Sequence, residues 1–349
     1  MDYNDIINTI QEVDCTPLID NAIILETECI TDKPFNHYTL NKENTTTIKE
    51  IILTKEILNN SIVNKKEEAK KRYKEKLIEF ATVITANFNK NDLKIFYKNM
   101  SDLKLNQKAS LRDITDNTAG KYLVFENEIV VIKDEYINSL YHELFHVSST
   151  ITDKPKVFSG FMQGNIDTKT SIANSINEGY TELLTKRYFE STAKNVYLYE
   201  VTMVKKLEEI IGKDKMESLY LNANLLGLIN ELKKYNTNEN IMEFINKFDF
   251  VSEHLILKDK TSDLDRKIQE AIEYVSYFLI NAYANKLKLY VDNNLISSTE
   301  QTESLLTYTK TFHQRYGTAN KSYSLFPNID INELLISNSY NENEAGFSK

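Results

Sequence analysis

Apolar side chains recur every three or four positions along most of the chain. From Ser61 onward, residues such as Tyr73 and Phe80 follow this spacing while charged side chains fill the opposite side, a pattern typical of an amphipathic helix. The same spacing predicts a second helix at 91–100. Only four prolines and eight glycines interrupt the 349 residues, and both residue types weaken or break helices. The sequence therefore predicts a helix-dominated protein.

The period changes in the stretch Gly120–Lys133, which is rich in β-branched and aromatic residues. Such residues favour strands, and Glu126 with Asn127 stands at the middle, where a turn is expected. The stretch therefore predicts a β-hairpin or two short strands. Apolar positions at helical spacing then predict a helix at about Asp134–Thr150.

The second half of the chain returns to the helical pattern after a loop. The loop is predicted at Lys154–Thr168, with a short strand at Val157–Met162, and a helix follows at about Ser171–Phe189. Asp263 is the predicted N-cap of a long helix, and Val291–Glu303 is predicted to be a polar connection. Two further helices are expected from apolar series at Leu198, Val201, Leu207 and Ile210 and at Leu221, Leu225, Leu228 and Leu232.

Composition and charge exclude several classes of protein. Lys plus Arg number 42 against 51 for Asp plus Glu, a net charge of −9, which argues against general binding of nucleic acid or of an anionic membrane. No uncharged apolar stretch approaches the 18 residues of a membrane-spanning helix. The first basic residue is Lys33, so no secretory signal is expected. Cys15 and Cys29 are too few for a disulfide scaffold. We expect a cytoplasmic protein, with export by another route left open.

Two histidines four residues apart are the strongest chemical signal in the chain. His142, Glu143 and His146 form an HExxH motif, and residues four apart on a helix lie about 5–6 Å from each other. Two imidazoles at that separation can each reach one Zn²⁺ at about 2.0–2.1 Å. The carboxylate between them can accept a proton from metal-bound water. A chance match is improbable because the chain has only five histidines.

A catalytic zinc usually needs a third protein ligand, which leaves one position for water. The third histidine of the metzincin motif is absent, because Ser149 and Thr152 occupy the glycine and histidine positions of that motif. Asp153 and Asp167 are conceivable ligands, but neither lies on a predicted helix. The best candidate is Glu178 on the predicted 171–189 helix.

The HExxH motif followed by a helix with an Asn-Glu-x-x-x-acid pattern resembles the gluzincins, the thermolysin-like superfamily of zinc peptidases. The resemblance covers about Gly120–Phe189. It implies that His142, His146 and Glu178 are zinc ligands and that Glu143 is the general base. It also implies a zincin-like catalytic core.

Two neighbours of the third ligand extend this resemblance. Glu182 matches the acidic residue that hydrogen-bonds a ligand histidine and so fixes its tautomer, and Gly179 matches a small residue that lets two helices approach closely. Two features depart from the thermolysin pattern. The 31 residues between His146 and Glu178 make a longer connection, and Glu182 stands where aspartate is usual.

The predicted fold is α+β and predominantly α-helical. We predict a mostly helical region at 1–110, a zincin-like core at 111–195 with the short β-hairpin before the HExxH helix, a helical domain at 196–336 and a disordered tail at 337–349.

The predicted function is zinc-dependent hydrolysis of peptide bonds in a peptide or protein substrate. The strand pair before the HExxH helix could take an extended substrate as an added strand. A donor for the developing oxyanion is also required, and the sequence does not choose among His254, His313 and several tyrosines. Two alternatives stay open: a catalytically inactive zinc-containing binding or regulatory protein, and a metal hydrolase acting on a non-peptide amide.

Overall fold

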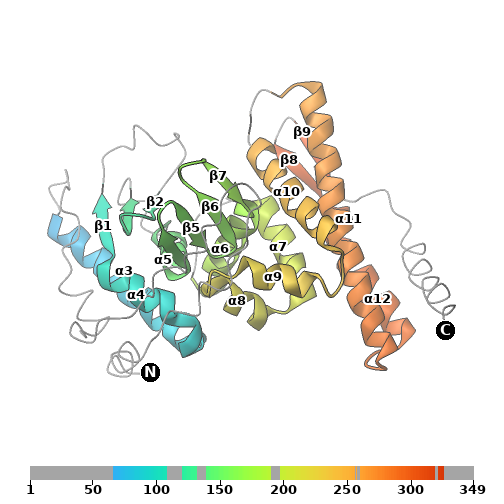
Figure 1. Cartoon of the computed structure of the whole chain (residues 1–349), viewed down its shortest axis with the longest axis horizontal. Coiled ribbons are helices and arrows are strands. Elements are labelled where there is room, and N and C mark those ends of the chain that lie inside the picture. Colours follow the sequence, from blue (N-terminus) through green and yellow to red (C-terminus); the bar gives the residue numbers. More distant parts are fainter. Residues whose placement is uncertain are drawn as a thin grey trace. The chain divides into compact units, whose positions relative to one another are not determined.

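Helices predominate in the computed structural model, and several short strands accompany them (Figure 1). The predicted fold class, α+β and mostly helical, is therefore confirmed. The predictions for the first 65 residues and for the tail at 337–349 lie outside the described part of the chain. The structure describes residues 66–107, 120–131, 139–189, 197–255, 257, 260–318 and 321–325.

The chain divides into two compact units. One comprises Met1–Ser171, Tyr180–Tyr197 and Glu217–Leu226, and the other comprises Ile172–Gly179, Leu198–Met216 and Gly227–Lys349. Helix α6 (Asn174–Tyr188) is continuous and contributes residues to both units. The predicted division at residues 110, 195 and 336 stays a prediction.

The first unit begins with two helices that bury their apolar sides. Helix α3 (Lys66–Asn87) follows the predicted pattern, with Leu77 and Phe80 fully buried. A single 3₁₀ turn leads into α4 (Lys94–Asp102), which corresponds to the helix predicted at 91–100. Phe80 lies against three other rings, those of Phe96, Phe145 and Phe189. This aromatic group joins α3 and α4 to the helix that carries the HExxH motif.

The predicted β-hairpin is confirmed as part of a three-stranded sheet. Strands β2 (Gly120–Leu123) and β3 (Glu128–Val131) are antiparallel, and Asn127 adopts a positive φ of 46° in their turn, a conformation that asparagine tolerates. Strand β1 (Lys104–Gln107), which the sequence pattern did not predict, pairs parallel to β3. The order β1-β3-β2 leaves β2 at one edge of this sheet.

The HExxH helix, α5 (Ser139–Ser148), lies against this sheet and against α3 and α4 (Figure 1). The residues before it, 132–138, lie outside the described part of the chain, so the predicted start is untested. The helix ends earlier than predicted, because Thr150 belongs to a strand. The side chain of Asn99 donates to the carbonyl oxygens of Val147 at 2.8 Å and Thr150 at 2.7 Å. These bonds satisfy carbonyl groups at the end of α5.

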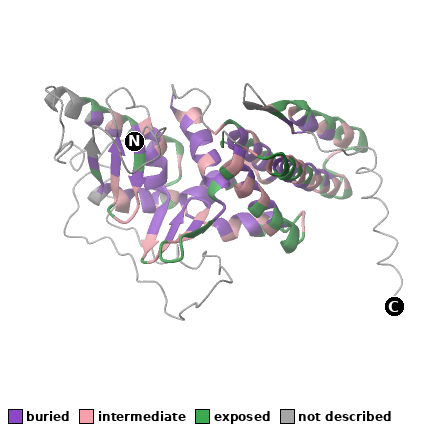
Figure 2. Ribbon diagram, turned by 90° about the horizontal axis from the view of Figure 1, so that it is seen from above, coloured by how far each residue is buried: buried purple, intermediate pink, exposed green. Residues whose placement is uncertain are grey.

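The loop predicted at Lys154–Thr168 is wrong, because this segment contains two strands of a four-stranded sheet, β5 (Lys156–Ser159) and β6 (Met162–Asn165). The short strand predicted at Val157–Met162 overlaps β5 and reaches the first residue of β6. Pro155 and Gly160 lie in turns of this sheet rather than in an extended loop. Its strands are only three or four residues long and include polar residues, so they carry little hydrophobic period. Figure 2 shows that β5 is largely buried and that the turn between β6 and β7 is exposed. The strands are β4 (Thr150–Asp153), β5 (Lys156–Ser159), β6 (Met162–Asn165) and β7 (Thr170–Ile172).

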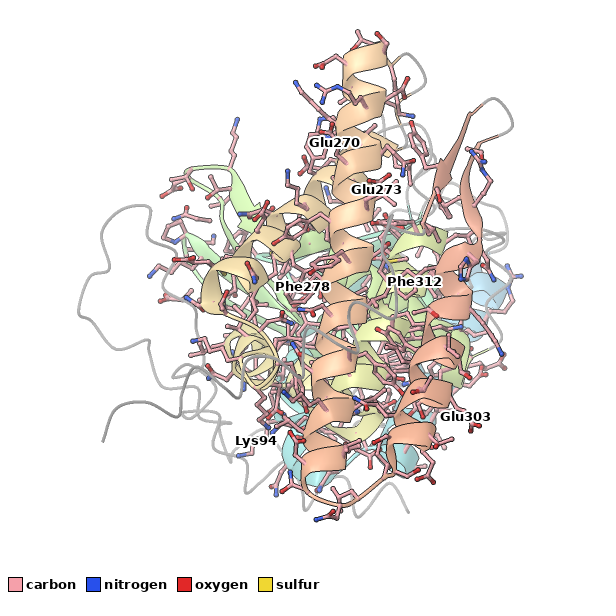
Figure 3. The ribbon with its side chains drawn as sticks, turned by 90° about the vertical axis from the view of Figure 1, so that its right-hand side faces the viewer. Lys94, Glu270, Glu273, Phe278, Glu303 and Phe312 are labelled. Carbon is pink, nitrogen blue, oxygen red and sulfur yellow. The ribbon has the colours of Figure 1, made fainter. Side chains whose placement is uncertain are left out.

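The second unit is organised around one helix of 31 residues, α11. This helix contacts α7, α10, α12 and β9, and Figure 3 shows α11 and α12 side by side. Tyr283 of α11 stacks on Tyr308 of α12, with 4.0 Å between ring centroids. The elements of this unit include α7 (Leu198–Ile211), α10 (Asn238–Leu255), α11 (Ser262–Asp292), α12 (Ser298–Thr309), β8 (Arg315–Thr318) and β9 (Lys321–Ser324).

Two helix boundaries differ from the prediction. Asp263 is not the N-cap of α11; Thr261 is, because its hydroxyl accepts a hydrogen bond from the N–H of Leu264 at 3.2 Å. The leucine series from Leu221 to Leu232 lies on two helices, α8 (Lys213–Leu221) and α9 (Leu225–Leu232). A turn at Ala223, whose φ is 50°, separates them.

The polar connection predicted at Val291–Glu303 is wrong in its second half, where α12 begins at Ser298. Ser297 and Glu300 form a capping box, in which each side chain bonds the backbone N–H of the other residue. A capping box stabilises a helix start that has few apolar residues. In the described part of the chain, no helix combines the length and the apolar character needed to cross a membrane. A cytoplasmic location stays a prediction.

Replacing Asn99 with alanine would remove the donor to the carbonyls of Val147 and Thr150. We expect Asn99→Ala to lower the free energy of unfolding by about 1–3 kcal/mol, the cost of leaving buried acceptors unsatisfied. Asn87→Ala is the matched control, because Asn87 donates to the carbonyl of Val83 from an exposed position; we expect a change within about 0.5 kcal/mol. Urea unfolding measures both, and equal losses would contradict the role given to Asn99.

Candidate metal centre

The structure brings together the three residues that the sequence predicts as metal ligands. One nitrogen each from His142 and His146 and one carboxylate oxygen of Glu178 lie within 4.8 Å of one another. The Nε2 atoms of the two histidines are 3.2 Å apart. Two nitrogens bound at about 2.0–2.1 Å to one tetrahedral Zn²⁺ would be about 3.3 Å apart. The observed spacing therefore fits two ligands of a single ion.

The histidine pair follows from the geometry of α5. His142 and His146 are one turn apart, so both side chains lie on the same side of the helix, and their rings meet edge to face with 4.9 Å between centroids. His146 is buried and His142 is half-buried. Neighbouring positions such as Leu144 and Phe145 are fully buried. The packing of α5 therefore fixes the positions of both imidazoles.

Glu182 contacts the Nδ1 edge of His142. Its Oε2 lies 3.1 Å from Nδ1 of His142. A neutral imidazole that donates from Nδ1 to a carboxylate has its lone pair on Nε2. This arrangement is the usual support of a metal-binding histidine. The other oxygen of Glu182 forms an ion pair with Lys186 at 3.1 Å, and the Glu182 side chain is only 3% exposed.

The three donor atoms could hold a metal ion. The Nε2 atom of His142 faces the Nε2 atom of His146, and Glu178 adds a carboxylate oxygen to this group. Two imidazole nitrogens and one carboxylate oxygen form a donor set that suits Zn²⁺.

Glu143 lies next to this group and is held at the edge of the three-stranded sheet. Its Oε2 accepts a hydrogen bond from the backbone N–H of Tyr122 in β2 at 2.9 Å, and the residue is only 8% exposed. A Cβ at Gly120 would make ordinary van der Waals contact with Cγ of Glu143, at 3.5 Å, and a tighter contact with Oγ of Ser139, at 3.0 Å. The predicted general base is thus buried and fixed by a backbone donor.

Helix α6 is capped by a residue that the sequence pattern did not identify. Asp249 of α10 accepts hydrogen bonds from the backbone N–H groups of Ala173 at 2.7 Å and Ser175 at 2.8 Å. Such groups at a helix start have no partner within the helix. Burial raises the pKa of the Asp249 carboxyl, and the N–H donors act in the opposite direction. Asp249 therefore fixes the first turn of the helix that carries Glu178.

Gly179 allows two helices to approach closely, but the partner helix is not the one expected. A Cβ at Gly179 would lie 2.8 Å from backbone and side-chain carbon atoms of Glu200 in α7, rather than against α5. The carboxyl group of Glu200 is buried beside this contact and receives a hydrogen bond from the hydroxyl of Ser252. Burial raises the pKa of Glu200, the Ser252 bond lowers it, and the charge of Glu178 raises it further.

Several other candidates do not join the three-residue group. Asp153 ends β4 and Asp167 lies in the turn after β6, and neither belongs to it. His254 has a local role, because its Nδ1 bonds the carbonyl of Phe250 one turn earlier and the two rings stack at 4.3 Å. His313 is exposed in a 3₁₀ turn. These observations give no reason to assign either histidine as the oxyanion donor.

Comparison with known proteins does not identify a family for this chain. A scan against protein-family models and searches of curated proteins and of solved structures found no match. The resemblance to gluzincins therefore stays a prediction that rests on His142, Glu143, His146, Glu178 and Glu182.

Loss of Glu182 should weaken metal binding without removing a ligand. We expect Glu182→Ala to raise the dissociation constant for Zn²⁺ by about 10–100-fold, the usual effect of losing the carboxylate that orients a ligand histidine. Competition with a chromophoric chelator measures the constant. Glu253→Ala is the control, because Glu253 is exposed on α10. An unchanged constant in Glu182→Ala would contradict the orienting role.

Adding one methyl group at Gly179 should separate α6 from α7. We expect Gly179→Ala to lower the free energy of unfolding by about 1–3 kcal/mol, as over-packing typically does, and to weaken zinc binding because Glu178 is the preceding residue. Gly164→Ala is the comparison, since its Cβ would come no closer than 3.3 Å, to the carbonyl of Thr170. If Gly179→Ala is as stable as Gly164→Ala, the close approach does not constrain the helix.

Proposed function

We propose that this protein is a zinc-dependent peptidase. The observation that carries the proposal is the grouping of His142, His146 and Glu178 within ligand spacing, with Glu143 held beside it. A structural zinc site is usually closed by four protein ligands, whereas a catalytic site commonly has three. A buried carboxylate next to a three-ligand group is the arrangement that hydrolysis requires.

The division of tasks among the residues follows from their positions. His142, His146 and Glu178 would hold the ion, and Glu182 would keep His142 in the tautomer that binds it. When bound, Zn²⁺ would polarise a carbonyl group and make a water molecule more acidic. Glu143 lies outside the three-residue group, so its carboxylate would exchange a proton with the reactants instead of binding the ion.

Glu143 would carry the proton through the reaction. Its carboxylate accepts a proton as the oxygen of water forms a bond to the carbonyl carbon of the scissile amide. It then gives this proton to the amide nitrogen as the C–N bond breaks. The products are an acid and an amine, and the second proton of water passes between them. The hydrogen bond from Tyr122 keeps one carboxylate oxygen in place.

The edge of β2 suits an extended polypeptide. β2 lies at one edge of its sheet, and the N–H of Tyr122 is directed to Glu143 instead of to β3. A peptide added as a strand along this edge would bring an amide group close to the Glu143 carboxylate, and backbone hydrogen bonds would hold it. This geometry favours a peptide or protein substrate over a small non-peptide amide.

Glu143→Gln tests the mechanism. Glutamine has nearly the same shape and can still accept the Tyr122 hydrogen bond, but it cannot take up the proton. We expect zinc content to stay at one equivalent and hydrolysis to fall by at least about 100-fold. Proteomic identification of new peptide ends, made by the wild type and not by the variant, measures the activity and shows the substrate.

Two further variants separate the possible outcomes. Glu178→Gln should lose zinc and activity together, and the exposed control Glu253→Gln should lose neither. Hydrolysis retained in Glu143→Gln would exclude Glu143 as the base. Zinc bound by the wild type without hydrolysis of any peptide would favour a zinc-containing binding protein or a hydrolase of another amide.

A further inference from the structure

The ring of one aromatic residue outside the predicted motif stacks against the imidazole of a candidate ligand. The ring of Tyr197, just before α7, is nearly parallel to the imidazole of His142, with 5.7 Å between centroids and 11° between planes. The residue is half-buried. Offset stacking of this kind is a favourable arrangement for two aromatic rings. Tyr197 therefore contacts a face of the imidazole, whereas Glu182 contacts its Nδ1 edge.

The backbone of Tyr197 is in an unusual conformation. Its φ is 53°, in the left-handed region that bulky side chains rarely adopt. Strained residues of this kind are held in place by the surrounding structure, and they concentrate at functional sites. The residue just before a helix normally has an extended backbone. Here the left-handed conformation accompanies the placement of the ring on His142.

We propose that Tyr197 is a positioning residue for His142 and thereby increases the affinity of the site for zinc. The inference rests on the proposed metal site. The imidazole of His142 can rotate about two side-chain bonds. The contact with Glu182 restrains its Nδ1 edge, and the Tyr197 ring restrains one of its faces, so the two contacts together restrict both rotations. Because both contacts exist before an ion binds, less freedom is lost when it does, and affinity increases.

The experiment compares two substitutions that keep a Cβ, and hence the backbone strain, at this position. Tyr197→Phe retains the ring and removes the hydroxyl, whereas Tyr197→Leu removes the ring. We expect the phenylalanine variant to bind Zn²⁺ as the wild type does, and the leucine variant to bind it about three- to tenfold more weakly. Zinc alone is the probe, and chelator competition gives the dissociation constants.

A second measurement excludes a general loss of structure. Urea unfolding of the zinc-free proteins should give the leucine and phenylalanine variants similar stabilities, so that the difference appears only when zinc is present. Equal zinc affinity in all three proteins would overturn the inference.

The outcome for Tyr197 can be separated from that for the proposed function. If the wild type binds zinc and the leucine variant binds it more weakly, the inference holds whether or not any peptide is cleaved. If the wild type binds zinc and the variants do not differ, the inference alone fails. A wild-type protein that binds no zinc would overturn both.

Discussion

The contact between Glu182 and Nδ1 of His142 is the interaction on which the candidate site depends. It holds the Nδ1 edge of the imidazole, so that the Nε2 atom faces His146, with Glu178 in the same group. Helix α5 carries His142 and His146 one turn apart, and α6 carries Glu178 and Glu182 one turn apart. Glu182 can therefore contact His142 while Glu178 lies in the same group as both histidines. Lys186, one further turn along α6, adds a positive charge beside the buried carboxylate. A short stretch of α6 thus supplies a candidate ligand (Glu178), the carboxylate that contacts His142 (Glu182) and a compensating charge (Lys186).

Much of this arrangement could be predicted because helical periodicity is a local property of the sequence. The spacing of His142 and His146 and that of Glu178 and Glu182 placed each pair on one side of a helix, and the α5 and α6 helices are present. The β2–β3 hairpin was predictable from its β-branched residues and central turn. In each case the relevant information lies within a few neighbouring residues.

The parts that could not be predicted depend on contacts between distant residues or on strands with an interrupted apolar pattern. Asp249 caps α6 from more than seventy residues away, and no local pattern marks it. Strands β4 to β7 are as short as β2 and β3, but polar residues and the turn residues Pro155 and Gly160 interrupt their apolar positions, whereas β2 and β3 lie in one stretch rich in β-branched and aromatic residues. The ring of Tyr197 stacks on that of His142 although the two residues are far apart in the sequence, and sequence spacing gives no signal for such a contact.

The role of Asp249 has a consequence for the order of events during synthesis. Both histidines and both glutamates of the site leave the ribosome long before Asp249 does. Until α10 has formed, the first backbone N–H groups of α6 lack the carboxylate that satisfies them. A nascent chain that ends ahead of residue 249 would therefore contain every candidate ligand and still lack the carboxylate that caps the helix carrying Glu178. The candidate site would be complete only after α10 has formed.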